Sequence, residues 1–178
     1  LNKIFEKNKC IGLDPMLHSI EEVSKIIELA KKSKTNLHFT SPNLIDELWL
    51  DKPKRQYSII FDHPVNYAGI DASNKVDQFV NELKSNNLDS YFLSSLDSIA
   101  WLLNIRADDI LHTPLAFSYL FISVENKPIL YLSIEKLNTD LKNRLSNFLN
   151  LQPIEKIDNI FKNLTKKLKV GFDYKNTS

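Results

Sequence analysis

The sequence predicts an α/β fold in which a mixed β-sheet is flanked by helices. Short apolar runs of strand length alternate with longer segments whose apolar residues recur every three or four positions, as they do on one face of a helix. Two runs, 116–124 and 128–133, are separated by the polar tripeptide Glu125-Asn126-Lys127, a pattern typical of a β-hairpin. Helices that alternate with strands indicate a layered domain.

The first part of the chain predicts a partial α/β unit. Residues 9–13 have the character of a short strand, and a helix is expected to begin at Ser19 because Glu22, three residues later, completes a capping box. A strand at 37–40 and a helical turn at 44–49 follow. This order is the ending of an α/β unit rather than a whole one, so residues 1–60 are assigned to the C-terminal part of a first domain.

The second domain is assigned to residues 61–178. Its start lies within a connector, 51–72, that carries Pro53, Pro64, Gly69 and several polar residues and contains a strand-like run from Tyr57 to Phe61. The segments expected in the second domain are a helix from Ser73, a strand at 89–94, a helix at 95–103, the hairpin, helices near 135–148 and 153–167, and a closing strand near 168–172.

Composition argues against nucleic-acid-binding, membrane-spanning and disulfide-bonded classes of protein. The net charge of +1 provides no strong field for nucleic acid or an anionic membrane, and no apolar run approaches the roughly 18 residues of a membrane span. The single cysteine, Cys10, excludes an internal disulfide and suits a reducing compartment, so a cytoplasmic location is expected. The first residue is Leu1 rather than Met, which leads us to expect that the chain begins inside a longer protein.

The sequence predicts no catalytic residue and no metal site within this chain. Its four histidines are scattered, and neither a His-x-x-x-His pair nor a Cys-x-x-Cys pair is present. With 3 glycines in the whole chain, a phosphate-binding glycine loop is not expected. No cofactor is therefore assigned to these residues.

One segment, 95–114, concentrates unusual side chains. It joins an apolar helix to a polar loop that holds one of only three arginines, two adjacent carboxylates and a histidine. Loops of this composition, held on rigid elements, commonly line binding sites, although a purely structural role stays open. The candidate substrate-facing residues are Asn104, Arg106, Asp108, Asp109 and His112.

The same segment carries a family resemblance. Residues 97–106 resemble the signature DSIAWLLNIRG of the three-domain Xaa-Pro aminopeptidases (aminopeptidases P), and residues 108–115 follow it in the family's order. Three further stretches, 11–18, 43–49 and 67–75, are similar to other motifs of that family. The chain departs from the pattern at Ala107, where the family usually has glycine; if that position needs a positive φ, alanine would strain the loop by roughly 1 kcal/mol.

The resemblance implies two creatinase N-terminal-type domains, the first of them incomplete. In full-length members a C-terminal "pita-bread" domain holds two manganese ions and removes an N-terminal residue that precedes proline; that domain is expected to lie beyond this chain. The implied partners are a peptide with proline at its second position, the protein's own catalytic domain and, in the full-length form, a second copy in a homodimer.

Two functions remain open from the sequence. The first is a non-catalytic N-terminal fragment of such an aminopeptidase that caps the active-site cleft and helps to position peptide. The second is a stand-alone peptide-binding or regulatory module without catalytic activity. In the first, Arg106 could pair with a peptide carboxylate or carbonyl; Asp108 and Asp109 could instead tether Arg106 within the loop.

Overall fold

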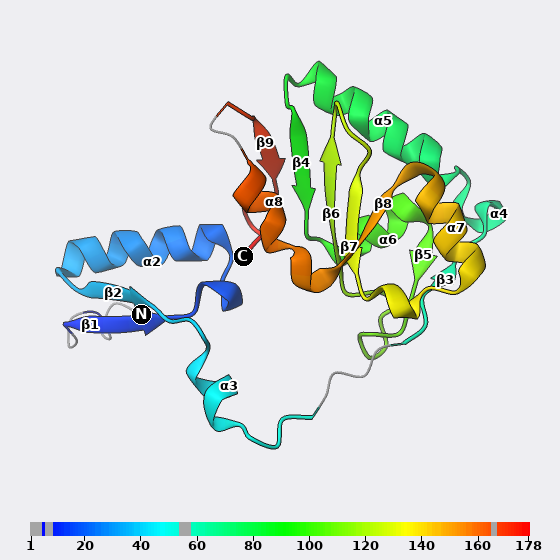
Figure 1. Cartoon of the computed structure of the whole chain (residues 1–178). Helices are drawn as coiled ribbons and strands as arrows, with labels where there is room; N and C mark the ends of the chain where they lie inside the picture. The colour runs from blue at the N-terminus through cyan, green and yellow to red at the C-terminus, as the bar shows by residue number, and fades with distance from the viewer. Residues whose placement is uncertain (1–4, 6–8, 54–57, 165–166) are drawn as a thin grey trace. The chain divides into compact units, whose positions relative to one another are not determined.

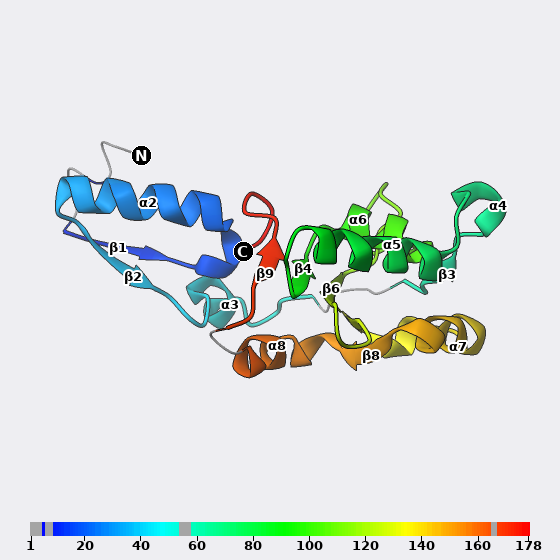
Figure 2. The ribbon, with the colours of Figure 1, turned by 90° about the horizontal axis from the view of Figure 1, so that it is seen from above.

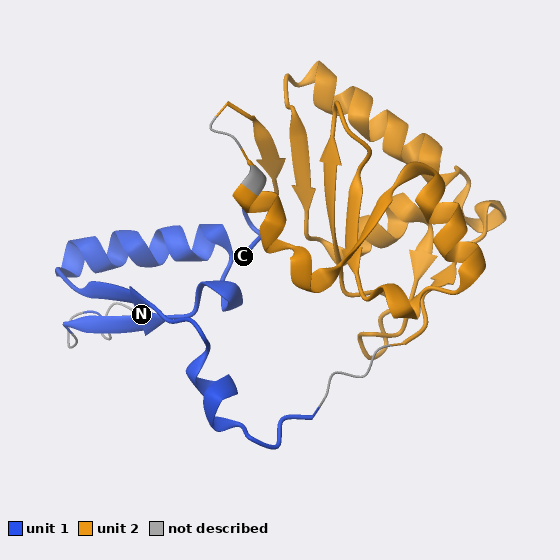
Figure 3. Ribbon diagram, in the orientation of Figure 1, with its two compact units in different colours: residues 1–55, 174–178 blue, residues 56–173 orange. Residues whose placement is uncertain are grey.

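The structure, a computed structural model, describes residues 5, 9–53, 58–164 and 167–178. The chain divides into two compact units, which Figure 3 distinguishes by colour: Leu1–Arg55 together with Tyr174–Ser178, and Gln56–Asp173. The domain boundary between residues 60 and 61 stays a prediction.

The first unit is built on one strand–helix–strand motif. Strands β1 (Cys10–Leu13) and β2 (Asn36–Phe39) are parallel, and α2 (Ile20–Ser33) connects them. The capping box is confirmed: the amide of Glu22 donates to Ser19 Oγ at 3.2 Å, and the amide of Ser19 donates to Glu22 Oε2 at 3.0 Å. The unit also contains the 3₁₀ turn η1 (Pro15–Leu17) and α3 (Leu44–Leu48).

The last residues of the chain belong to this first unit. The amide of Ile20 donates to the carbonyl of Thr177 at 2.8 Å, and the amide of Glu21 donates to the carbonyl of Tyr174 at 3.1 Å. Amides in the first turn of a helix have no partner within the helix. The C-terminal segment therefore supplies hydrogen-bond acceptors for amides in the first turn of α2.

The second unit contains a five-stranded mixed sheet in the order β8-β7-β6-β4-β9 (Figure 1). The predicted hairpin is confirmed, because β6 and β7 are antiparallel neighbours; β4 is antiparallel to β6, while β9 and β8 run parallel to β4 and β7. The strands are β4 (Ser90–Leu93), β6 (Ser118–Ser123), β7 (Ile129–Leu132), β8 (Asn150–Pro153) and β9 (Val170–Phe172).

Helices cover both faces of this sheet, as Figure 2 shows for α5 and α6 on one side and α8 on the other. Along β6, Leu120 and Ile122 enter the larger core, whereas Tyr119 and Phe121 turn to the opposite face, as the two-residue period of a strand requires. The helices that contribute to the larger core are α5 (Ala72–Ser85), α6 (Leu96–Leu103) and α7 (Thr139–Phe148), and α8 (Asp158–Asn163) covers the other face.

Five smaller elements complete the described part of the second unit. A short antiparallel pair joins β3 (Phe61–Asp62) to β5 (Ile105–Arg106), and the 3₁₀ turn η2 (Ile134–Lys136) follows β7. The helix α4 (Val65–Ala68) lies between β3 and α5, and the 3₁₀ turn η3 (Ile154–Lys156) precedes α8.

Several element boundaries differ from the sequence prediction. Asp71, not Ser73, is the N-cap of α5, and Ser73 donates to its carboxylate. The strand β8 and the helix α4 were not predicted, and α8 is shorter than the expected 153–167. Tyr57, where the connector strand was expected to begin, lies outside the described residues. Within the described residues, no helix has the length and apolar character that crossing a membrane requires.

Candidate functional site

The candidate loop begins at Asn104, the residue that ends α6. Asn104 has φ 52° and ψ 49°, the left-handed conformation that asparagine tolerates better than most residues at a helix C-terminus. Its side chain is buried: Oδ1 accepts from Lys75 Nζ at 2.8 Å, and Nδ2 donates to the carbonyl of Ile70 at 2.9 Å. Asn104 therefore fixes the base of the loop rather than facing solvent.

Lys75 is the residue that the sequence analysis missed at this base. It is 3% exposed, and its ammonium donates to the carbonyl of Trp101 at 2.8 Å and lies 4.2 Å from the centre of the Trp101 ring. Burial lowers the pKa of Lys75, the nearby Arg106 charge lowers it further, and Asp71 opposes both. The sequence could have indicated that Lys75 is buried, because it lies four residues before Phe79 and thus on the apolar face of α5.

Arg106 is partly buried, and the two edges of its guanidinium group differ in their contacts. Its Nη1 donates to the carbonyls of Ala100 at 2.9 Å and Ile105 at 2.8 Å, while Nε and Nη2 make no hydrogen bond with the described residues. The pairing of β5 with β3 fixes its backbone. The guanidinium is thus held on one edge and retains donors on the other.

Asp109 anchors the middle of the loop inside the protein. Its carboxylate accepts from the amide and hydroxyl of Ser58, each at 3.0 Å, and from the amide of Phe117 at 2.9 Å, and it forms an ion pair with Lys136. The exposed fractions of the Asp109 and Lys136 side chains are 0% and 2%. Burial alone would raise the pKa of Asp109, but these hydrogen bonds and the Lys136 charge together lower it.

This arrangement replaces the tether considered from the sequence. Asp109 pairs with Lys136, not Arg106, and Asp108 is exposed, with its amide donating to Ser58 Oγ at 2.6 Å. Ser58 and Lys136 lie 51 and 27 residues from Asp109, so no local pattern in the sequence identifies them.

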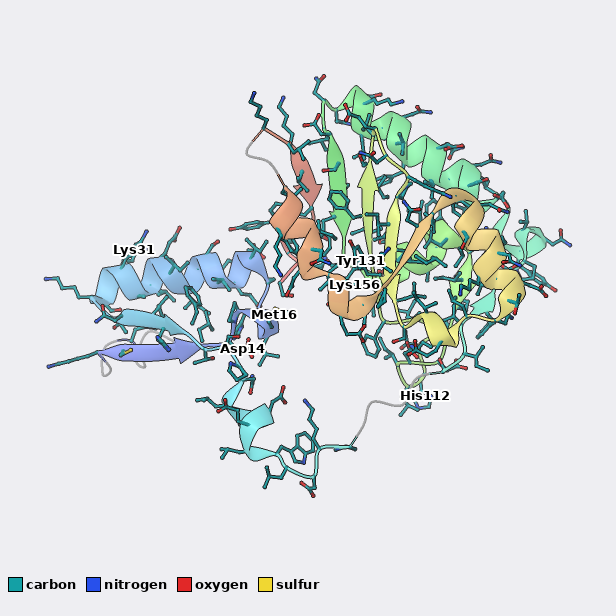
Figure 4. All side chains as sticks on the ribbon, viewed as in Figure 1. Asp14, Met16, Lys31, His112, Tyr131 and Lys156 are labelled. Carbon is teal, nitrogen blue, oxygen red and sulfur yellow. The ribbon has the colours of Figure 1, made fainter. Side chains whose placement is uncertain are left out.

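The tip of the loop is exposed. Figure 4 shows His112 at its outer end, where the backbone adopts φ 61°, and the neighbouring Leu111 is 82% exposed. A tight turn holds this tip, because the amide of Thr113 donates to the carbonyl of Ile110 at 3.0 Å.

The strain considered at Ala107 does not arise. The non-glycine residues with positive φ in the described part of the chain are Lys34, Asn87, Asn104 and His112. Ala107 is fully buried, and its amide donates to the carbonyl of Pro114 at 3.4 Å. The loop thus accommodates alanine without a left-handed backbone.

The loop brings the five candidate residues into three separate environments rather than one cluster. Asn104 and Arg106 lie at its base, Asp108 and Asp109 are linked through Ser58, and His112 stands at the tip. In the described residues, no group of three or more His, Cys, Asp and Glu side chains is arranged to hold a metal ion.

Residues 51–178 match the Creatinase/Prolidase N-terminal domain family, and the chain belongs to this family. The mixed sheet with helices on both faces confirms the predicted fold class.

The relatives of the chain are much longer proteins. A probable Xaa-Pro aminopeptidase P from Talaromyces marneffei is 35% identical over 153 residues, which are 85% of this chain and 23% of the relative. Aminopeptidase P2 from Arabidopsis thaliana is 32% identical over 83% of this chain and 21% of its own length. The chain thus spans about a quarter of the length of such relatives.

A solved structure agrees with these matches. The X-prolyl aminopeptidase from Caenorhabditis elegans, described as a cytosolic enzyme with a di-nuclear active site, superimposes with a TM-score of 0.85 and 29% identity. The match covers 92% of this chain and 26% of the nematode enzyme. The chain is therefore homologous to the N-terminal region of these aminopeptidases.

Proposed function

We propose that this chain is a non-catalytic N-terminal part of a Xaa-Pro aminopeptidase, in which residues 104–114 face the catalytic cleft and help to position peptide. Its partners are then the catalytic domain of the same protein and a peptide with proline at the second position. The two-metal chemistry belongs to that catalytic domain, and the location is cytoplasmic, like that of the nematode relative.

The observation that carries the proposal is the contrast between the buried base and the exposed tip of the loop. The base is fixed by Asn104 and by the buried Asp109–Lys136 pair, whereas the tip presents Leu111 and His112 to solvent. A functional loop must hold its contact groups in a defined geometry while keeping them accessible.

The surface beside the loop supports contact with another domain. Ser58 bonds to Asp108 and Asp109, and the residues that follow it, Ile59 and Phe61, are both exposed. Leu111 lies in the loop itself, and Ile59 and Phe61 lie next to Ser58, which is hydrogen-bonded to the loop. We infer that these side chains contribute to the contact with the catalytic domain, because contiguous groups of exposed apolar side chains mark interfaces.

Arg106 gives the sharpest test, made in a full-length relative at the position aligned with it. Replacement Arg106→Ala is expected to lower kcat/KM for a Xaa-Pro peptide by about tenfold or more, because charge-assisted hydrogen bonds to peptide are lost. Arg106→Lys, which keeps the charge but not the second donor edge, is expected to recover only part of the activity. Unchanged kinetics in the alanine variant would refute the contact.

The purified 178-residue chain provides the complementary assay. With added manganese it is expected to cleave no Xaa-Pro peptide, while a full-length relative does so under the same conditions. Manganese-dependent cleavage by the chain alone would show that the catalytic centre is not elsewhere and would overturn the proposal.

A further inference from the structure

The second unit contains a hollow that the proposed function does not use. It lies on the sheet face that carries α8 and has a volume of about 510 Å³. We call it the α8 hollow; its walls include Phe121, Ile129 and Tyr131 from the sheet, Asn159 and Ile160 from α8, and Ser90 from β4. Figure 1 shows that α8 and the candidate loop lie in different parts of the second unit.

The hollow exists because α8 is too short to cover its face of the sheet. Strand alternation directs Phe121, Ile129 and Tyr131 to this face, where Ile160 of α8 packs against part of the cluster. The helix has 6 residues, Asp158–Asn163, whereas α5, on the opposite face, has 14. Phe121 and Ile129 remain partly exposed and line the hollow, whereas Tyr131 is buried.

Ser90 supplies an unused polar group at the wall of the hollow. It is 2% exposed, and its Oγ has no hydrogen-bond partner among the described residues. Ser123, directly opposite on β6, differs because its Oγ already accepts from the amides of Glu125 and Asn126. A buried hydroxyl without a partner is unfavourable, and a molecule bound in the hollow, which Ser90 lines, would supply one.

Among the described residues, three charged side chains line the hollow; Glu125 is exposed to solvent, and the other two make hydrogen bonds. Lys127 Nζ donates to the carbonyl of Ser146 at 2.6 Å, and Asp89 Oδ2 accepts from the amide of Lys169 at 2.7 Å. A charged ligand would have to compete with the bonds of Lys127 and Asp89, whereas an uncharged ligand can use the apolar side chains and the Ser90 hydroxyl. Its volume lies within the roughly 300–1,000 Å³ typical of small-molecule sites.

We propose that the α8 hollow binds a small uncharged aromatic molecule of up to three rings, packed against Phe121 and Ile129, that donates one hydrogen bond to Ser90 Oγ. Aromatic rings prefer offset or edge-on contact with other rings, and the partly exposed ring of Phe121 provides such a contact. The site is independent of the proposed function, and its presence or absence leaves that function unaffected.

The test uses N-phenyl-1-naphthylamine, an uncharged aromatic probe with a single N–H, titrated into the purified chain while its fluorescence is followed. Saturable binding to one site is expected. Asn159→Phe, which fills the hollow from α8, is expected to weaken binding at least tenfold. Lys162→Phe adds the same ring to an exposed position of α8 that does not line the hollow, and is expected to bind like the wild type.

Ser90→Ala tests the hydroxyl. It is expected to weaken binding of the amine probe about fivefold. The dissociation constant of 1-phenylnaphthalene, which has no N–H, is measured by displacement of the probe and is expected to stay unchanged. Thermal unfolding of each variant verifies that it is folded. Absence of saturable binding, or equal binding by the Asn159→Phe and Lys162→Phe variants, overturns the site; equal effects of Ser90→Ala on both probes overturn the role of the hydroxyl.

Discussion

The ion pair between Asp109 and Lys136 is the strongest single constraint on the candidate loop. Both side chains are buried, so removing one charge leaves the other without compensation. Asp109→Asn is therefore expected to lower the free energy of unfolding of the second unit by about 3 kcal/mol or more. Urea denaturation followed by circular dichroism measures this change.

A double variant separates the ion pair from the rest of the site. Asp109→Asn combined with Lys136→Met removes both charges, and it is expected to be more stable than Asp109→Asn alone, because no unpaired ammonium remains buried. If the double variant is the less stable of the two, the buried charge of Lys136 is not what destabilises the single variant.

The same carboxylate predicts a pH dependence. Since the pKa of Asp109 is lowered in the folded protein, the unfolded chain takes up the proton first as the pH falls. The stability contributed by Asp109 is thus complete at neutral pH and declines below about pH 5. The difference in unfolding free energy between the wild type and Asp109→Asn is expected to be smaller at pH 3 than at pH 7; an equal difference at both would contradict the assignment.

At the scale of elements, the contact between β4 and β9 depends on a glycine. Tyr91 of β4 stands opposite Gly171 of β9, and a Cβ at residue 171 would lie 2.6 Å from Cδ2 of that ring. Gly171→Ala is expected to cost about 1–3 kcal/mol, because the ring or the strand must move. The shift in thermal unfolding measures it.

Gly12 provides the matched control for this substitution. In β1 the same added methyl would meet Thr40 Cγ2 at 3.4 Å, an ordinary contact. Gly12→Ala is therefore expected to change stability by less than about 0.5 kcal/mol. If the two alanine variants behave alike, close approach to Tyr91 is not the reason that position 171 holds glycine.

Elements with local signals were predicted from the sequence, and those fixed by distant contacts were not. The capping box at Ser19 and the hairpin around Asn126 depend on residues a few positions apart, and both are confirmed. The strand β8 was missed because the short run Asn150–Pro153 has no alternating pattern and forms only by pairing with β7.

The same distinction between local signals and distant contacts explains how much of the candidate site was predicted from the sequence. The unusual composition of residues 104–114 marked the loop, but its support comes from Lys75, Ser58 and Lys136, which the fold brings from far along the chain. Composition could not tell that Asn104 and Asp109 are buried anchors while His112 is exposed. The assignment of substrate contact to these residues stays a prediction.

At the scale of the whole molecule, the two units bury apolar surface very unequally. Among described residues, the second unit has a continuous core around Ile99, Leu120 and Leu130, whereas the first buries the apolar side chains Phe5, Leu13 and Ala30. Its two parallel strands leave most of their residues at least partly exposed, although parallel sheets are usually covered on both faces. The first unit is therefore expected to be the less stable one.

The chain carries a reporter for each unit, because its 2 tryptophans, Trp49 and Trp101, fall one in each. In the Trp101→Phe variant, fluorescence of Trp49 follows the first unit, and in Trp49→Phe, fluorescence of Trp101 follows the second. We expect the Trp49 signal to change at a urea concentration lower by about 1 M or more, since a unit with less buried surface has less stability to lose. Coincident midpoints of the two single-tryptophan variants would instead mean that the chain unfolds as one cooperative body.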